Sequence, residues 1–192
     1  MQKFRLRNNQ KGFTLVEIAI VMVIIGLLIG GILKGQEMIN NAKVKRVVKQ
    51  ADEMRAAVMT FYDKYGQYPG DENSPLFPPG TDTTTGNNNG QIAGAEINAV
   101  MSDLALANLI SGTYNATTPL PSNAFGGTTS VAWVDPPGPV VAKHFIVYTV
   151  LPPEVCQEID VKYDDGVYTT GSIIGSAAYT AGGAPLTLYI AF

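Results

Sequence analysis

The stretch from Phe13 to Leu33 constrains this chain more than any other, because only Thr14 and Glu17 among its 21 residues are polar. A helix of that length rises about 30 Å, which is enough to cross the hydrocarbon core of a bilayer. A carboxylate inside such a segment costs on the order of 1–3 kcal/mol, and less near the interface than at the midplane. The stretch therefore predicts a helix that spans a membrane or fills the core of a bundle, and in which Glu17 has a use.

The residues in front of this stretch form a short basic leader, 1–12. It carries Lys3, Arg5, Arg7 and Lys11, has no acidic residue, and ends at Gly12, a small residue suited to cleavage. An ordinary secretory signal fits less well, because its apolar region is usually shorter and no small-x-small cleavage site follows this one. An ordinary signal anchor would leave the glutamate without a purpose.

The run Lys11-Gly12-Phe13-Thr14-Leu15-Val16-Glu17 resembles the prepilin processing motif of type IV pilins and type II secretion pseudopilins. The resemblance implies that a prepilin peptidase cuts between Gly12 and Phe13 and methylates the new amino terminus of Phe13. It also implies that Glu17 pairs with the Phe13 ammonium of an adjacent subunit during assembly. Removing one partner of a buried ion pair strands the other charge, at about 3–5 kcal/mol.

The resemblance also implies partners and a location. The partners would be identical or related pilin subunits, the prepilin peptidase, an inner-membrane assembly platform and the membrane itself. The precursor would be a single-pass inner-membrane protein, and the processed chain a periplasmic or extracellular filament. Basic residues flank both sides of the apolar stretch, so this orientation follows from the resemblance and not from the charge distribution.

Three functions are compatible with these residues. The first is a structural subunit of a type IV pilus-like filament, and the second is a pseudopilin of a type II secretion system. The third is a membrane-anchored binding domain that stays monomeric, although a monomer would not need both the cleavage motif and Glu17.

Charge and cysteine content restrict the ligands and the covalent cross-links that we expect for this chain. The leader holds four of the 13 Lys and Arg and none of the 16 Asp and Glu, so residues 13–192 have a formal charge of about −7. Such an acidic chain argues against general nucleic-acid binding, which needs clustered cations. Cys156 is the single cysteine, so an intrachain disulfide is impossible, and we expect it to be buried.

After Leu33 the apolar residues recur every three or four positions, which predicts that the helix continues as an amphipathic segment over 34–65 and ends at Gly66 and Pro69. Four glycines between 26 and 35 favour either close helix packing or local melting. The predicted organisation is a leader at 1–12, a transmembrane or filament-core helix at 13–33, its amphipathic continuation at 34–65, and a globular domain at 66–192.

The sequence pattern of the globular part predicts an α+β fold, in which the long N-terminal helix packs on a C-terminal antiparallel sheet with long loops. Turn-forming residues indicate loops over 69–91 and 113–129. Two segments, 65–71 and 159–166, are similar to stretches of one pilin-like subgroup. Helices are expected over 95–110 and from Leu151 onward, and strands over 130–135, 144–151 and 186–192.

Few residues in the domain suggest a chemical site. Asp160, Asp164 and Asp165 precede Gly166, and the resemblance to major pseudopilins, which bind calcium in a C-terminal loop, makes them a candidate calcium site. A solvated Asp-Gly turn is the alternative. Asp71 and Glu72 are a thinner candidate that a turn explains. The single histidine, His144, is expected on the surface at a strand end, and no catalytic set is apparent, so we do not expect an enzyme.

Overall fold

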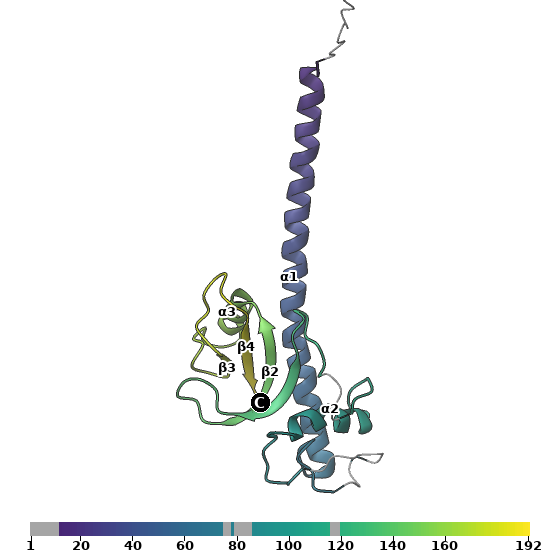
Figure 1. Cartoon of the computed structure of the whole chain (residues 1–192), viewed down its shortest axis with the longest axis vertical. Helices are drawn as coiled ribbons and strands as arrows, with labels where there is room; N and C mark the ends of the chain where they lie inside the picture. Colours follow the sequence, from purple (N-terminus) through teal and green to yellow (C-terminus); the bar gives the residue numbers. More distant parts are fainter. Residues whose placement is uncertain (1–11, 75–77, 79–85, 116–119) are drawn as a thin grey trace, which may run out of the picture. The chain divides into compact units, whose positions relative to one another are not determined.

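A computed structural model describes residues 12–74, 78, 86–115 and 120–192 of the protein (Figure 1). Apart from Gly12, the predicted leader lies outside the described residues. Contacts divide the chain into two compact units, Met1–Ala42 and Lys43–Phe192. The helices are α1 (Leu15–Tyr65), α2 (Glu96–Leu106) and α3 (Pro153–Tyr163), and the strands are β1 (Thr129–Val134), β2 (Lys143–Leu151), β3 (Ile173–Gly175) and β4 (Leu186–Ala191).

The described part of the first unit consists of the start of α1 and the three residues before it. Nearly every side chain from Leu15 to Ala42 is exposed, including the large apolar ones. Among the described residues, α1 is the one helix that is long and apolar enough to cross a membrane, judged by length and composition. A helix that is apolar on all sides needs lipid or other helices around it, because water does not stabilise such a surface.

In the second unit, the remainder of α1 buries a single row of side chains. The row repeats every three or four residues, which places its members on one face of the helix. α1 ends at Tyr65, where Gly66 adopts a φ of +73° and its N–H donates to the Tyr62 carbonyl over 2.7 Å. This ending confirms the role predicted for Gly66. The buried row comprises Val44, Val47, Ala51, Met54, Ala57, Val58 and Phe61.

The four strands form one antiparallel sheet in the order β1-β2-β4-β3. Ile146 of β2 pairs with Val131 on one side and with Ile190 on the other, and Ile190 pairs in turn with Ile173. These four buried residues line the sheet face that packs on the row of α1, within one core cluster. The α+β fold with a long helix against an antiparallel sheet is therefore confirmed.

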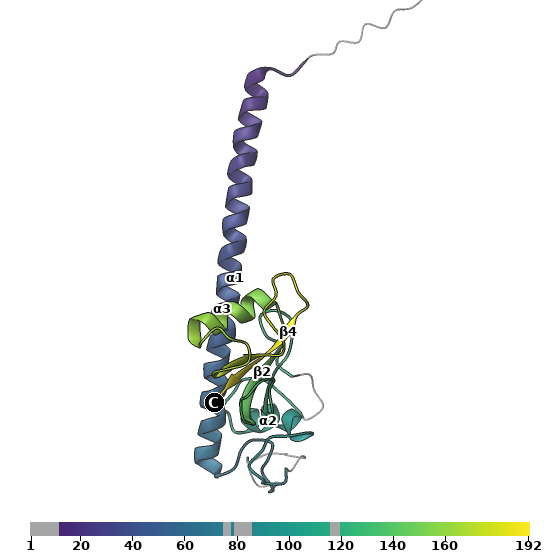
Figure 2. The ribbon, with the colours of Figure 1, turned by 90° about the vertical axis from the view of Figure 1, so that its left-hand side faces the viewer.

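The opposite face of the sheet follows the alternation expected of strands. Phe145 and Val147 of β2 lie on it, between Ala132 and Ile174, in a second and smaller apolar cluster. α2 and α3 both contribute to the main core, and they lie toward opposite ends of the sheet (Figures 1 and 2). Pro153 stands in the first turn of α3, as the sequence predicted.

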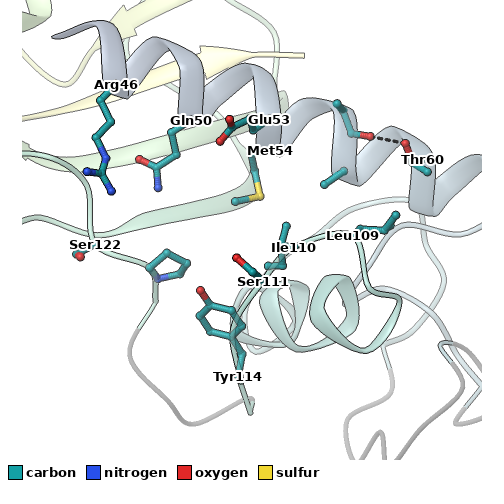
Figure 3. Close-up of a pocket in the computed structure, with 13 residues that line it drawn as sticks. Arg46, Gln50, Glu53, Met54, Thr60, Leu109, Ile110, Ser111, Tyr114 and Ser122 are labelled. Atoms are coloured by element: carbon teal, nitrogen blue, oxygen red, sulfur yellow. Dashed lines mark hydrogen bonds between the residues drawn. The ribbon is translucent and has the colours of Figure 1, made fainter. Parts of the chain in front are cut away.

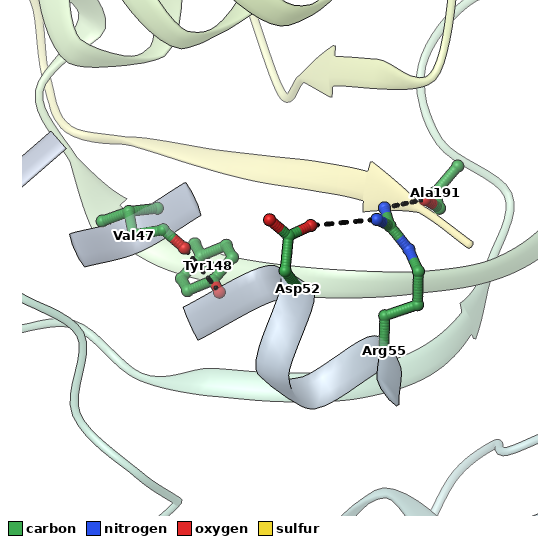
Figure 4. Close-up of polar contacts among 5 residues, drawn as sticks. All are labelled: Val47, Asp52, Arg55, Tyr148 and Ala191. Atoms are coloured by element: carbon green, nitrogen blue, oxygen red, sulfur yellow. Dashed lines mark hydrogen bonds and ion pairs between the residues drawn. The ribbon is translucent and has the colours of Figure 1, made fainter. Parts of the chain in front are cut away.

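Two polar contacts fasten the sheet to the α1 segment of the second unit (Figure 4). The hydroxyl of Tyr148 donates to the Val47 carbonyl over 3.1 Å, and burial raises the pKa of that hydroxyl. Arg55 lies 3.1 Å from the Asp52 carboxylate and donates to the Ala191 carbonyl of β4 over 2.9 Å. The helix and the sheet are thus joined by hydrogen bonds as well as by apolar packing.

A bulge interrupts the pairing of β2 with β4 between Tyr148 and Leu151. Val150 lies in the bulge with a φ of +59°, a conformation that is strained for a β-branched residue. The neighbouring Thr149 carbonyl accepts a hydrogen bond from the Asn123 amide over 2.8 Å, and Gly127 leaves room for this carbonyl. The bulge is thereby held by a loop from outside the sheet.

Two local predictions need correction, and one strand was not predicted. α2 ends at Leu106 instead of Ile110, because Asn108 adopts a φ of +58° that a continuing helix does not allow. β3 was not expected, since a strand of three residues carries too little periodicity to be detected. The prediction that His144 lies on the surface is wrong, because its side chain is only 6% exposed.

Candidate assembly site at the N-terminus

The predicted processing site lies at the start of the described chain. Gly12 is exposed, with no atom within 4 Å of the position that a side-chain carbon would occupy. Phe13 is 83% exposed. Both residues of the junction between Gly12 and Phe13 are therefore exposed.

Glu17 and Thr14 form a reciprocal cap at the first turn of α1. The Glu17 carboxylate accepts hydrogen bonds from the Thr14 N–H and from the Thr14 hydroxyl, each over 2.8 Å. In return, the Glu17 N–H donates to the Thr14 hydroxyl oxygen over 3.2 Å. This is the capping box, a Ser or Thr followed three residues later by Glu or Gln.

Sequence reasoning had missed the part played by Thr14, although the signal was present in Thr14-Leu15-Val16-Glu17. The cap means that the Glu17 carboxylate has hydrogen-bond partners in the single chain. Its two lone-pair-rich oxygens retain capacity for a further partner, since an ionised carboxylate offers about four acceptor positions. A neighbouring ammonium group would be such a partner.

The three predicted calcium ligands do come together in the second unit. One carboxylate oxygen from each of Asp160, Asp164 and Asp165 lies within 4.8 Å of the others. Asp160 is fully buried at the end of α3, where it accepts hydrogen bonds from the Tyr179 hydroxyl over 2.8 Å and from the Gly166 N–H over 3.1 Å. Burial, followed by repulsion from Asp164 and Asp165, raises the pKa of Asp160.

The other two carboxylates organise the loop that follows α3. Asp164 accepts hydrogen bonds from the N–H groups of Ser172 and Ile173 over 2.6 and 2.7 Å. Asp165 accepts one from the Thr170 hydroxyl over 2.6 Å, which lowers the pKa of Asp165. These bonds alone would hold the loop, so the geometry suits both a hydrogen-bonded turn and an oxygen-rich cation site.

Asp71, the thinner candidate, serves a different loop. It is 1% exposed and accepts hydrogen bonds from the N–H groups of Asn89 and Gly90 over 3.1 and 2.7 Å. The adjacent Gly70 N–H donates to the Asp103 carboxylate of α2 over 2.5 Å. Asp71 therefore fixes the course of the chain before α2, and it lies apart from the cluster at Asp160.

His144 is buried among aromatic rings at one end of the sheet. Its Nε2 accepts a hydrogen bond from the Ile92 N–H over 3.2 Å, which makes Nε2 the unprotonated nitrogen. Burial lowers the pKa of His144, against the opposing effect of the Asp71 charge. The ring lies 4.4 Å from that of Tyr68, 5.0 Å from Trp133 and 5.8 Å from Phe192, measured between centroids.

A groove of about 880 Å³ runs between α1 and the loop after α2 (Figure 3). Arg46 and Glu53 reach into it from α1, and Ser111 and Tyr114 face them from the loop. Its described lining contains no His, Cys or Asp.

Comparison with known proteins agrees with the N-terminal geometry. Residues 7–33 match the family model for the prokaryotic N-terminal methylation motif. Two curated relatives are similar. A fimbrial protein of Neisseria meningitidis serogroup B is 36% identical over 70 residues, which cover 36% of this chain and 41% of the relative. A fimbrial protein of serogroup A is 32% identical over 78 residues, which cover 40% of this chain and 46% of the relative.

The chain thus carries the prokaryotic N-terminal methylation motif and is similar to these two fimbrial proteins over part of its length. The matched segments span less than half of the length of either relative. No solved structure matches the chain significantly.

Proposed function

We propose that this protein is a structural subunit of a type IV pilus-like filament, cleaved after Gly12, methylated at Phe13 and assembled through α1. One observation carries the proposal: a helix exposed and apolar on all sides begins directly after the Gly12–Phe13 junction and carries Glu17 in its first turn. The relatives, both named fimbrial proteins, support the same function.

Two environments satisfy the exposed helix in succession. Before processing, lipid surrounds it, and the precursor is a single-pass protein of the inner membrane, where the prepilin peptidase and the assembly platform act on it. After processing, helices of identical or related pilin subunits surround it in a periplasmic or extracellular filament. Both environments remove a large apolar surface from water, at roughly 25 cal/mol per Å².

Glu17 links the two stages. In the precursor its carboxylate is held by Thr14, which lowers the cost of placing the charge at the start of an apolar helix. In the filament it pairs in addition with the ammonium of Phe13 from a neighbouring subunit. A charge-assisted hydrogen bond is roughly twice as strong as a neutral one, and it also fixes the register between the two helices.

A type II secretion pseudopilin is the second candidate, and the cluster of Asp160, Asp164 and Asp165 favours it. We propose calcium as the ion for this cluster. The three carboxylates would supply oxygen ligands, which calcium prefers, with carbonyl groups and water completing its six to eight positions. The ion would then stabilise the loop after α3 in a domain that has no disulfide.

The experiment that tests the filament proposal is microscopy of cells that produce the chain with a complete assembly machinery. Filaments labelled by an antibody to residues 43–192 are expected for the wild-type chain. A bulky residue at position 12 should obstruct the peptidase, so Gly12→Leu should leave the precursor in the membrane and produce no labelled filaments. Val141→Leu, at an 81% exposed position between β1 and β2, is the control for expression. Absence of labelled filaments in the wild type would overturn the proposal.

A further inference from the structure

The positive charge of the second unit is concentrated on one short segment of α1. Four of its eight basic residues lie between Lys43 and Lys49, and no acidic residue lies between Met38 and Ala51. Lys45, Arg46 and Lys49 are exposed. Lys45 and Lys49 lie on the side of α1 away from the buried row that contains Val47, and Arg46 lies beside the groove of Figure 3. We call these three residues the basic stripe.

The basic stripe is only partly neutralised within the chain. Lys49 forms an ion pair with Glu53 over 3.3 Å, in which the two side chains are 78% and 66% exposed. Such an exposed ion pair contributes little to the free energy of folding. Within the described part of the chain, no ion pair is formed by Lys45 or Arg46. The stripe therefore presents two to three positive charges to solvent.

An exposed face of the opposite sign lies on α3. Val155, Cys156 and Ile159 turn one side of this helix into the core, and Glu154 and Glu158 lie one turn apart on the exposed side. Glu154 accepts a hydrogen bond from the Gly182 N–H, which lowers the pKa of Glu154 and keeps it ionised. No ion pair to Glu158 exists among the described residues. We call Glu154 and Glu158 the acidic face.

Building on the proposed filament, we propose that the acidic face of one subunit docks on the basic stripe of the next. Residues 43–192 carry eight basic and 14 acidic groups, so two copies repel each other unless opposite charges meet. The stripe and the face lie on different helices, so one subunit can use its stripe with one neighbour and its face with another. Such a contact is heterologous and leaves a free stripe and a free face at the two ends. A contact of this kind propagates into a filament instead of closing a dimer.

Anionic lipid is a less suitable partner for the stripe. Lys45 follows Leu33 by twelve residues, about 18 Å along a helix. That distance is about two Debye lengths at physiological ionic strength, so attraction to headgroups at the end of the apolar stretch is largely screened. A second copy of the chain can approach the stripe directly, and direct approach is what electrostatic complementarity requires.

Charge reversal in the full-length chain, in cells with the assembly machinery, tests this contact. Lys45→Glu with Lys49→Glu should lower filament yield by roughly tenfold or more, and Glu154→Lys with Glu158→Lys should do the same. Combining all four changes restores opposite charges and should recover most of the yield. Lys64→Glu with Lys143→Glu alters net charge equally outside both surfaces and should assemble normally.

The filament yields of these variants distinguish a failure of the proposed contact from a failure of the filament proposal. If the wild type forms filaments and the variant with Lys45→Glu and Lys49→Glu assembles normally, the proposed contact is overturned and the filament proposal stands. The same conclusion follows if the combination of all four changes does not recover the filament yield. The wild type could also bind vesicles that contain phosphatidylglycerol. If the reversed stripe loses this binding but assembles normally, the stripe binds lipid, and the proposed contact is overturned. No wild-type filaments at all would overturn both proposals. Equal thermal melting of residues 43–192 in all variants excludes misfolding as the cause.

Discussion

α1 carries two kinds of apolar surface, and they have opposite relations to the rest of the chain. Up to Ala42 the apolar side chains are exposed on all sides, whereas from Val44 they form one row that is buried against the sheet. The first surface is completed only by something outside the chain. The second is completed by residues that the chain itself supplies, among them Ile146 and Tyr148.

This difference has a consequence for mutations. Changes in the first part of α1 should act on insertion and assembly while leaving the folding of residues 43–192 unaffected. Changes in the second part should act on folding first, and on assembly only through it. The following predictions test that division.

The largest effect is expected at Glu17. Glu17→Val removes a membrane penalty, so the chain should insert at least as well as wild type. It should nevertheless form no filaments on its own, because the Phe13 ammonium of each neighbour would lose its partner. The fraction of filaments recovered by shearing and sedimentation measures this.

Thr14→Val is the matched control for Glu17→Val. It removes the hydroxyl of the cap, at about 1 kcal/mol, but leaves the carboxylate in place. It should therefore assemble at a yield close to wild type. Normal assembly of Glu17→Val would show that the carboxylate is dispensable, and equal failure of both variants would assign the role of Glu17 to the cap alone.

Phe61 tests the second half of α1. It is fully buried in the main core, so Phe61→Ala should destabilise residues 43–192 by about 3–5 kcal/mol in urea unfolding. Ile24→Ala, in the exposed part of the helix, should leave the unfolding of the same domain in the full-length chain unchanged. A comparable loss from Ile24→Ala would contradict the division of α1 into two surfaces.

Much of this division follows from the sequence, because it depends on local patterns. The apolar stretch, the amphipathic row and the stop at Gly66 are all periodicities or single residues that act over one or two turns. The sheet order and the pairing of Ile146 with Val131 and Ile190 depend on partners distant in sequence, so periodicity predicts the strands and not their register.

The errors and omissions in the candidate site have similar causes. His144 is polar and follows Lys143, so a surface position was predicted. In the fold, the rings of Tyr68, Trp133 and Phe192 converge on His144 and bury it, although they are distant from it in sequence. Thr14 was missed because the motif around it was interpreted as a peptidase signal, although the same four residues also form a helix cap. The approach of Asp160 to Asp164 and Asp165 was predicted because they lie within six residues.

Calcium provides the next largest expected effect. An ion that binds only the folded state stabilises it by about 2.7 kcal/mol at a hundredfold excess over its Kd. Residues 43–192 should then melt at a higher temperature with millimolar calcium than with a chelator. Asp164→Ala and Asp165→Ala should abolish most of that difference, and Asp71→Ala should retain it. Identical melting of the wild-type domain in both conditions would leave the cluster as a hydrogen-bonded turn.

A smaller effect on the stability of residues 43–192 is expected from a change of pH. Burial lowers the pKa of His144 in the folded state, so its contribution to stability is present above the unfolded pKa of about 6.5 and is lost as pH falls below it. Stability of residues 43–192 should therefore decline between pH 7 and pH 5. Because His144 is the single histidine, His144→Gln should flatten this decline, even if it lowers stability overall. An unchanged pH dependence in the variant would assign the decline to carboxyl groups.

The central claim is that the first part of α1 is completed by other copies of the chain after cleavage at Gly12. Mass spectrometry of chains taken from sheared filaments tests it most directly. The account predicts a chain that begins at Phe13 and carries one methyl group on its amino terminus. Filament-associated chains that retain residues 1–12 would contradict the account.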